Sequence, residues 1–171
     1  PIALYSGTLT GLDMKYHSVE SPGSDFNLPE PKRLEGSVQK NLHSVMNDTI
    51  EMGKQMLVFV SSRSSAQKEA RELSGHLKTK LESGDLGFTE AVVESWTSMS
   101  QQLWRGEDGS ATVKALSNSV RGGVGFHHAG LTSSQRRVIE NGFRNGNLQC
   151  IVATPTLAQG VNLPASRVVV R

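Results

Sequence analysis

At 171 residues the chain is long enough for one sizeable hydrophobic core, so its length favours a single main domain over several. Apolar residues make up 36% and charged residues 20% of the chain, which argues against disorder, and a formal net charge of +2 neither requires nor excludes a nucleic-acid partner. No apolar run approaches the length of a transmembrane helix and no signal-peptide pattern opens the chain, so we expect no membrane partner.

The N-terminal region reads as a strand followed by a loop. Residues Ile2–Leu9 favour a short strand, and Tyr16–Gly36 contains three prolines among polar residues. Because proline disrupts helices and central strands, we expect Tyr16–Gly36 to be a linker or surface loop without chemistry. Residues 1–36 are therefore assigned to this N-terminal segment, and residues 37–171 to the main domain.

The middle of the chain alternates between helical and strand patterns. Apolar residues at helical spacing predict helices over Val38–Ile50 and Ala66–Leu81. Between them, Gln55–Val60 is almost continuously apolar, which is typical of a central strand covered on both faces. Two further helices are predicted over residues 88–103 and 111–120.

Two short apolar runs near the C-terminus, Val124–Phe126 and Cys150–Ala153, predict strands. Between them, Thr132 and Gln135 have the spacing of a capping box at the start of an amphipathic helix. A crossover of this length joins parallel strands, so the fold class is α/β with a mainly parallel sheet. A further strand starts at Val168, and we expect the end at Arg171 to be a fragment boundary.

Ligands of parallel α/β sheets bind beyond the carboxyl ends of the strands. The loops His127–Leu131 and Thr154–Asn162 both follow such ends, so we expect them to open on one edge of the sheet. The serine-rich turn Ser61–Ser65 follows the strand Gln55–Val60 in the same way. It fits either a phosphate site, through its hydroxyls and the helix N-terminus, or plain helix capping.

Three residues whose side chains could bind a ligand or react are better explained as structural residues. The single cysteine, Cys150, lies within an apolar strand, where a thiol is usually a small core residue. Trp96 and Trp104 lie at helical spacing, which favours packing between helices over stacking on bases.

Several common motifs are missing from the sequence. It contains no Walker A loop, no Gly-x-Gly-x-x-Gly fingerprint and no Gly-x-Ser-x-Gly elbow. The sequence therefore gives no support for a P-loop NTPase site, a dinucleotide-binding dehydrogenase or an α/β-hydrolase in this chain. His127 and His128 are adjacent, so in an extended chain they point to opposite faces and do not form a metal site.

Three motifs resemble the second RecA-like domain of superfamily-two helicases of the Ski-like group, most closely the archaeal DNA repair helicases of the Hel type. Phe126–Leu131 reads Phe-His-His-Ala-Gly-Leu and is similar to motif IVa of that group. Residues 153–164 read Ala-Thr-Pro-Thr-Leu-Ala-Gln-Gly-Val-Asn-Leu-Pro and are similar to motif V. Val58–Arg63 corresponds to motif IV. The resemblance extends from Lys54 to Arg171 and implies a RecA-like three-layer domain.

The resemblance also implies roles for residues in these motifs. It implies that eight residues contact the backbone of a nucleic-acid strand or support the motifs that make this contact. They are Ser62, Arg63, His128, Ala129, Gly130, Thr154, Pro155 and Thr156. Gly160 and Asn162 would face the nucleotide, so that one short helix joins both ligands. Singly, each residue also has a structural explanation, such as a helix cap for Thr154 or a buried histidine for His128. The ordered set favours the functional interpretation.

The resemblance implies an ATP-dependent helicase with ATP and Mg²⁺ as cofactors. Both would be held mainly by the first RecA-like domain, whose Walker A lysine and acidic motif are not in this chain. Motif VI would follow Arg171, so we expect no catalytic residue, no metal ligand and no ATP hydrolysis by this chain alone. Implied partners are that first domain and single-stranded or branched DNA. The expected location is cytoplasmic and nucleoid-associated, or nuclear in a eukaryote.

Three alternatives stay open at this point. The chain fits an RNA helicase of the same group, because backbone contacts discriminate poorly between DNA and RNA. It also fits a helicase-like cassette that has lost ATPase activity and serves as a protein-interaction platform. An unrelated α/β nucleotide-binding protein is excluded if the loops that hold Ser62 and Thr154 share one edge of the sheet.

Overall fold

The computed structural model describes residues 4–20, 26–105, 109–159 and 161–171. The chain divides into two compact units, Pro1–Asp48 (unit 1) and Thr49–Arg171 (unit 2). No helix in these described stretches is both long and apolar enough to cross a bilayer.

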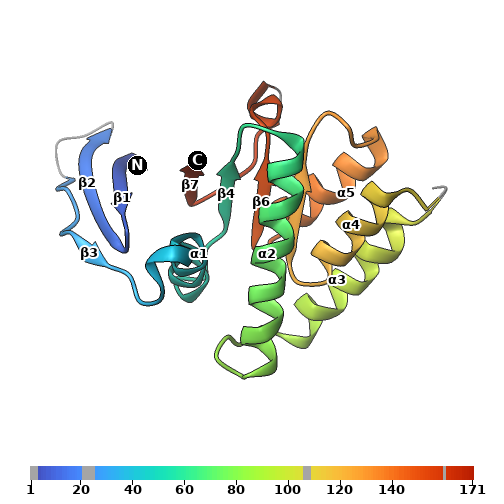
Figure 1. The fold of residues 1–171 in the computed structure, drawn as a ribbon, viewed down its shortest axis with the longest axis horizontal. Coiled ribbons are helices and arrows are strands. Elements are labelled where there is room, and N and C mark those ends of the chain that lie inside the picture. Colours follow the sequence, from blue (N-terminus) through green and yellow to red (C-terminus); the bar gives the residue numbers. More distant parts are fainter. Residues whose placement is uncertain (1–3, 21–25, 106–108, 160) are drawn as a thin grey trace. The chain divides into compact units, whose positions relative to one another are not determined.

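Unit 1 contains a small antiparallel sheet in the order β1-β2-β3 (Figure 1). Its strands are β1 (Leu4–Thr10), β2 (Asp13–Glu20) and β3 (Lys32–Arg33), followed by η1 (Val38–Lys40) and α1 (Asn41–Glu51), which begins in unit 1. The strand expected over Ile2–Leu9 is confirmed as β1 from Leu4 onward, and Ile2 and Ala3 lie outside the described residues.

The loop expected over Tyr16–Gly36 is wrong at both ends. Tyr16–Glu20 belongs to β2, which is the central strand of the small sheet, and Lys32 and Arg33 form β3. The reason is that the first proline of this segment, Pro22, comes after the strand has ended. This proline therefore lies outside β2 and does not interrupt its hydrogen bonds.

Unit 2 is an α/β domain whose four parallel strands follow the order β5-β6-β4-β7. The predicted fold class is thus confirmed, and the apolar strand expected to be central is β4, an interior strand of the sheet. The strands are β4 (Met56–Phe59), β5 (Val124–His127), β6 (Cys150–Ala153) and β7 (Arg167–Val170). The remaining elements are α2 (Arg63–Glu82), α3 (Glu90–Leu103), α4 (Ala111–Val120), α5 (Ser133–Arg144) and η2 (Pro155–Gln159).

Capping side chains define where the helices of unit 2 begin. The hydroxyls of Ser62, Thr89, Ser110 and Thr132 each accept a backbone N–H in the first turn of α2, α3, α4 and α5, respectively. At α5, Thr132 and Gln135 form the complete capping box that the sequence predicts. Such caps satisfy backbone donors that have no partner within the helix.

The core of unit 2 lies between the sheet and its helices. Every residue of β5 and β6 is buried, and so are Ile139 and Phe143 on the inner side of α5. Cys150 is fully buried, and its burial raises the pKa of the thiol well above its ordinary range. The interpretation of Cys150 as a small core residue is therefore confirmed.

The two tryptophans have different environments. Trp96 is buried, and its indole N–H donates to the Asn147 carbonyl at 2.7 Å, as expected for a residue that packs between helices. Trp104 is the C-cap residue of α3, and its indole N–H donates to Ser117 Oγ of α4 at 2.9 Å, so it contacts a neighbouring helix as expected, although its side chain is 40% exposed. Helical spacing did not predict this exposure, because α3 ends at Leu103, one residue before Trp104.

Candidate nucleic-acid interface

Three strand ends of unit 2 meet at one edge of the sheet. In the parallel register, Ala153 of β6 pairs with Phe59 on one side and with His127 on the other. Backbone bonds continue past the strands, because Val60 N donates to Ala153 O at 2.9 Å and Thr154 N donates to His127 O at 3.1 Å. The connections after β4, β5 and β6 therefore open at the same carboxyl edge, as predicted.

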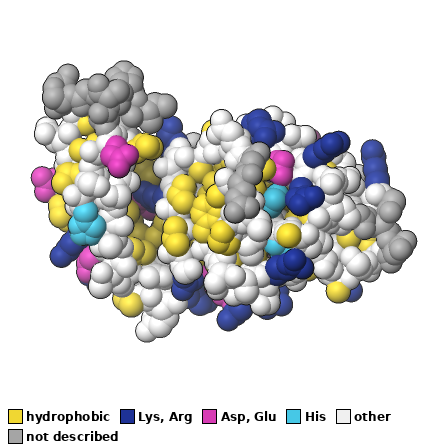
Figure 2. Space-filling view, turned by 90° about the horizontal axis from the view of Figure 1, so that it is seen from above, with side chains coloured by type: hydrophobic (Ala, Val, Ile, Leu, Met, Phe, Trp, Pro, Cys, Tyr) yellow, Lys and Arg dark blue, Asp and Glu magenta, His cyan; other side chains and the backbone are white. Residues whose placement is uncertain are grey.

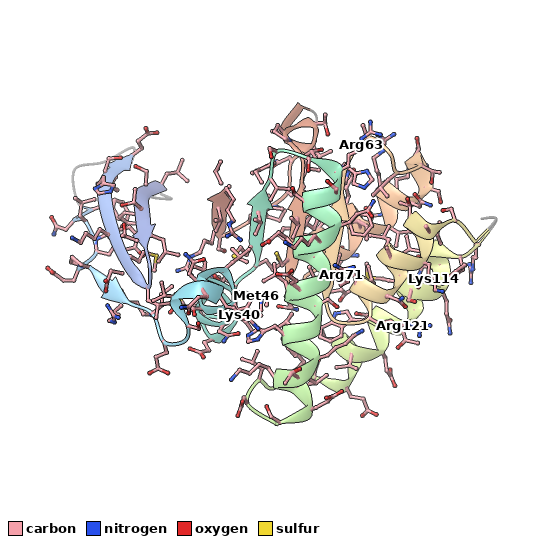
Figure 3. All side chains as sticks on the ribbon, in the orientation of Figure 1. Lys40, Met46, Arg63, Arg71, Lys114 and Arg121 are labelled. Carbon is pink, nitrogen blue, oxygen red and sulfur yellow. The ribbon has the colours of Figure 1, made fainter. Side chains whose placement is uncertain are left out.

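Ser62 and Arg63 follow β4 and begin α2. The Ser62 hydroxyl accepts the Ser65 N–H at 3.1 Å and also bonds the Ser65 hydroxyl at 2.8 Å, so it is engaged in helix capping. Arg63 is exposed and projects from the start of α2 at the edge (Figure 3). Of the predicted motif IV pair, Arg63 is the exposed residue and the one that carries a charge.

His128 braces the turn after β5 instead of facing solvent. Its ring is 2% exposed and stacks on Phe126 with a centroid distance of 5.4 Å. In the neutral ring Nδ1 accepts the Gly130 N–H at 3.1 Å, and Nε2 lies 3.1 Å from Gln67 Nε2 of α2. Burial, followed by the charges of Arg63 and His127, lowers the pKa of His128 and keeps this neutral arrangement.

The turn that His128 braces is exposed at Ala129 and Gly130. A Cβ at Gly130 would lie 3.0 Å from His128 Nδ1 and 3.4 Å from Arg63 Nη1. The backbone of motif IVa and the guanidinium of motif IV are thus close neighbours, although they come from different strand ends. An absent side chain at Gly130 also lets a ligand approach this backbone closely.

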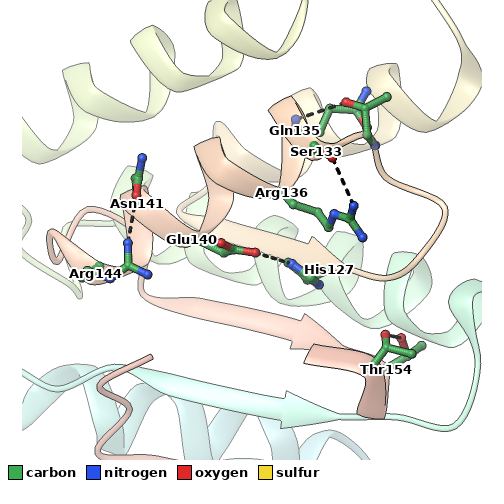
Figure 4. A network of polar contacts seen from close by, with 10 residues as sticks. His127, Ser133, Gln135, Arg136, Glu140, Asn141, Arg144 and Thr154 are labelled. Carbon is green, nitrogen blue, oxygen red and sulfur yellow. Dashed lines mark hydrogen bonds and ion pairs between the residues drawn. The ribbon is translucent and has the colours of Figure 1, made fainter. Parts of the chain in front are cut away.

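His127 faces the other side of the sheet. Its Nε2 lies 2.8 Å from Glu140 Oε1 of α5 (Figure 4), and its buried Nδ1 has no hydrogen-bond partner in the described part of the chain. Burial lowers the pKa of His127, although Glu140 acts in the opposite direction. The adjacent histidines therefore fasten the end of β5 to α5 on one face and to α2 on the other, which agrees with the opposite orientations predicted for them.

Thr154 lies directly after β6 and is buried, with 8% of its surface exposed. Its Oγ1 lies 3.0 Å from Oγ1 of Thr156, and both Thr156 and Pro155 are exposed (Figure 4). The outward hydroxyl at this position is therefore that of Thr156, with Thr154 behind it. Direct contact between Thr154 and phosphate stays a prediction.

The predicted nucleotide-facing residues follow η2. Asn162 is exposed, and its side-chain amide offers both donors and an acceptor, which fits contact with a nucleotide. Gly160 lies outside the described residues. A short helix is present in this segment as η2, a 3-10 helix over Pro155–Gln159 that starts directly after Thr154 and ends before Asn162.

Gln67 and Glu140 are the site residues that sequence reasoning missed. Each lies on a helix and contacts a histidine of motif IVa, at a sequence separation of 61 residues for Gln67 and 13 for Glu140. The only available signal was a polar residue close to the buried stripe of an amphipathic helix, which is too common to identify a partner.

Comparison with known proteins identifies a matching family and several relatives. Residues 108–171 match the helicase conserved C-terminal domain family. The chain is 37% identical over 142 residues to the ATP-dependent DNA helicase Hel308 of Methanocella arvoryzae, an alignment that covers 83% of the chain and 18% of that protein. It is 41% identical over 144 residues to Hel308 of Caldivirga maquilingensis, with 81% and 18% covered. For Hel308 of Pyrococcus horikoshii the identity is 38% over 124 residues, with 72% and 16% covered. The chain thus spans less than a fifth of the length of these relatives.

Proposed function

The chain contains the C-terminal domain of a superfamily-two helicase, and from this premise we propose that its carboxyl edge holds the sugar-phosphate backbone of a single nucleic-acid strand. The observation that supports this most directly is the convergence of three connections at one edge. They bring together the Arg63 guanidinium, the exposed backbone at Ala129–Gly130 and the Thr156 hydroxyl. A cation, backbone donors and a hydroxyl are the groups that bind phosphate.

The electrostatics of the edge support an anionic ligand. Arg63 stands at the N-terminus of the 20-residue helix α2, where the helix dipole adds to its positive charge. Figure 2 views the molecule from the side of this edge and shows Lys and Arg side chains in dark blue around it. Contacts of this kind position a strand without reading its sequence, and they weaken as salt rises.

The second part of the proposal concerns ATP. Residues Gly160 and Asn162 would complete, in the intact enzyme, an ATP and Mg²⁺ site whose main part lies on the first RecA-like domain. ATP binding and hydrolysis supply the free energy for movement along the strand. In this chain η2 (Pro155–Gln159) follows directly after Thr154 and precedes Asn162 in sequence, and coupling would pass through this segment.

DNA is the proposed substrate, because the relatives compared above are named DNA helicases. The first RecA-like domain and single-stranded or branched DNA are the proposed partners. RNA is the alternative that the binding assay below includes.

The test is an ATPase and binding assay on the full-length enzyme, with and without single-stranded DNA or RNA. Replacing the exposed Arg63 with alanine removes one phosphate contact. The plot of log affinity against log salt should become less steep by about 0.7, the value for one contact on a single strand. DNA-stimulated ATPase should fall, with basal turnover kept.

Arg144→Ala is the matched control, because Arg144 is also an exposed arginine but lies at the end of α5, where it bonds Asn141 (Figure 4). It should leave the salt dependence and the stimulation unchanged. If Arg63→Ala and Arg144→Ala bind DNA alike, the proposed interface is wrong. Thr154→Ala should also lower stimulation more than basal turnover, and equal loss of both would refute coupling through η2.

A further inference from the structure

A second basic surface lies on the outer helices of unit 2, away from the strand ends. On α2, Arg63, Gln67 and Arg71 are spaced four residues apart and therefore share one side of the helix. That side adjoins α4, since Ser74 Oγ donates to the Ser119 carbonyl at 2.8 Å. Arg71 is exposed, and it continues along α2 the positive charge that begins with Arg63 at the candidate interface (Figure 3).

The exposed side of α4 adds to this charge. Lys114 of α4 and Arg121, the C-cap residue of this helix, are both exposed and lie seven residues apart, about two helical turns, so they share one side. The stretch 110–121 contains these two basic residues and no acidic residue. On α2 the nearby Glu69 lies on the other side of the helix, where it pairs with Arg171 at 2.8 Å.

A buried pair of serines fixes two exposed side chains on this surface. Ser100 of α3 and Ser117 of α4 are buried, and their hydroxyls lie 2.6 Å apart. The Trp104 indole N–H donates to Ser117 Oγ at 2.9 Å, and Arg121 Nε donates to Ser100 Oγ at 2.9 Å. The exposed part of Trp104 and the outer nitrogens of Arg121 are thereby held in place. Preorganised tryptophan and arginine side chains are typical of binding surfaces, because little entropy is lost on contact.

We infer that Arg71, Trp104, Lys114 and Arg121, here named the α2/α4 face, form a second binding surface for single-stranded nucleic acid. Basic side chains that follow a strand, beside an aromatic ring on which a base stacks, are the usual means of binding single strands without sequence preference. The eight residues from Arg63 to Arg71 span about 12 Å along α2, so a strand that leaves the carboxyl edge along this helix reaches Arg71, the first residue of the α2/α4 face.

Continuity with the carboxyl edge favours nucleic acid over an acidic peptide as the ligand, and in this respect the inference rests on the proposed function. The two sites together predict that affinity depends on strand length. A short oligonucleotide occupies the edge alone, and a longer one also covers the α2/α4 face.

The test compares two variants that each remove two exposed basic residues. Arg71→Ala with Lys114→Ala alters the α2/α4 face, and Lys68→Ala with Arg144→Ala is the control of equal charge. Affinities of the full chain for oligothymidylates of about 6 and about 25 nucleotides are measured over a salt series. The face variant should bind the longer oligonucleotide at least about tenfold more weakly, with a salt slope lower by about 1.4, and the shorter one unchanged.

Trp104 gives an independent readout, because the chain has only two tryptophans and Trp96 is buried. The longer oligonucleotide should quench tryptophan fluorescence, and Trp104→Phe should abolish the quenching. Unchanged binding of the longer oligonucleotide by the face variant, or equal weakening of both lengths, overturns the inference but not the proposed function. Binding of neither oligonucleotide by the wild-type chain overturns both. Polyglutamate binding with the same dependence on Arg71 and Lys114 overturns the assignment to nucleic acid.

Discussion

The turn between α4 and β5 provides a quantitative test of the packing in unit 2. Gly123 has a φ of +74°, and a Cβ on it would lie 2.6 Å from Cζ2 and 2.9 Å from Cε2 of Trp96. The Trp96 ring cannot withdraw freely. It is buried, packs edge-on against Phe88 at 5.3 Å and donates a hydrogen bond to the Asn147 carbonyl.

Gly123→Ala should therefore destabilise unit 2 through two separate effects. The left-handed backbone costs an alanine about 1–2 kcal/mol. Forcing a methyl group against a fixed ring adds about 1–3 kcal/mol. The expected loss of about 2–5 kcal/mol is a large part of the 5–15 kcal/mol by which domains of this kind are usually stable.

Urea unfolding followed by circular dichroism measures this loss, and Gly84→Ala is the matched control. Gly84 has a nearly equal φ of +76°, but a Cβ there would meet nothing within 4 Å. The control should show the backbone cost alone. The difference between the two variants then isolates the packing against Trp96. Equal destabilisation by Gly84→Ala and Gly123→Ala would refute the reasoning.

Three further predictions concern polar groups of unit 2. Burial lowers the pKa of His127 and His128 below the ordinary value of about 6.5. The unfolded chain therefore binds more protons than the folded chain, and the free energy of unfolding should fall as the pH drops through about 6.5. A urea midpoint independent of pH between about 7.5 and 5.5 would contradict this. Thr132→Ala removes the capping box of α5 and should cost about 1 kcal/mol in thermal unfolding, whereas Thr132→Ser should cost clearly less; equal losses would exclude the cap as the cause. Ser119 is buried, and its Oγ lies within hydrogen-bond distance of backbone carbonyls in both α2 and β5. Ser119→Ala should therefore lower the free energy of unfolding in urea by about 1–3 kcal/mol. An unchanged urea midpoint would show that these bonds make no net contribution to stability.

Local signals were sufficient for most elements of unit 2. The run Val124–Phe126 predicted β5 because its apolar residues stop abruptly, and Thr132 with Gln135 placed the start of α5 at its observed position. Local signals did not predict the strand at Tyr16–Glu20. The prolines that follow this stretch indicated a loop, although they begin only after the strand ends.

The site was predictable as a set of positions but not as a set of contacts. Sequence order indicated that Arg63 and Gly130 would lie at one edge, and the register confirms it. The Gln67 contact with His128 depends on how α2 lies across the sheet, which no local pattern encodes. The burial of Thr154 likewise depends on how the chain turns after β6, and a motif does not specify this.

The strand order of unit 2 has a consequence for how the protein is made. β4 and β5 are not neighbours, because β6 lies between them and pairs with both. During translation, β4, the helices α2, α3 and α4, and β5 are therefore synthesised before β6, the strand that pairs with both β4 and β5. Until β6 leaves the ribosome, the apolar strands β4 and β5 have edges without a β6 partner. Their later pairing with β6 is parallel and long-range, and pairing of this kind is slow. The nascent chain should depend on chaperones most during this interval.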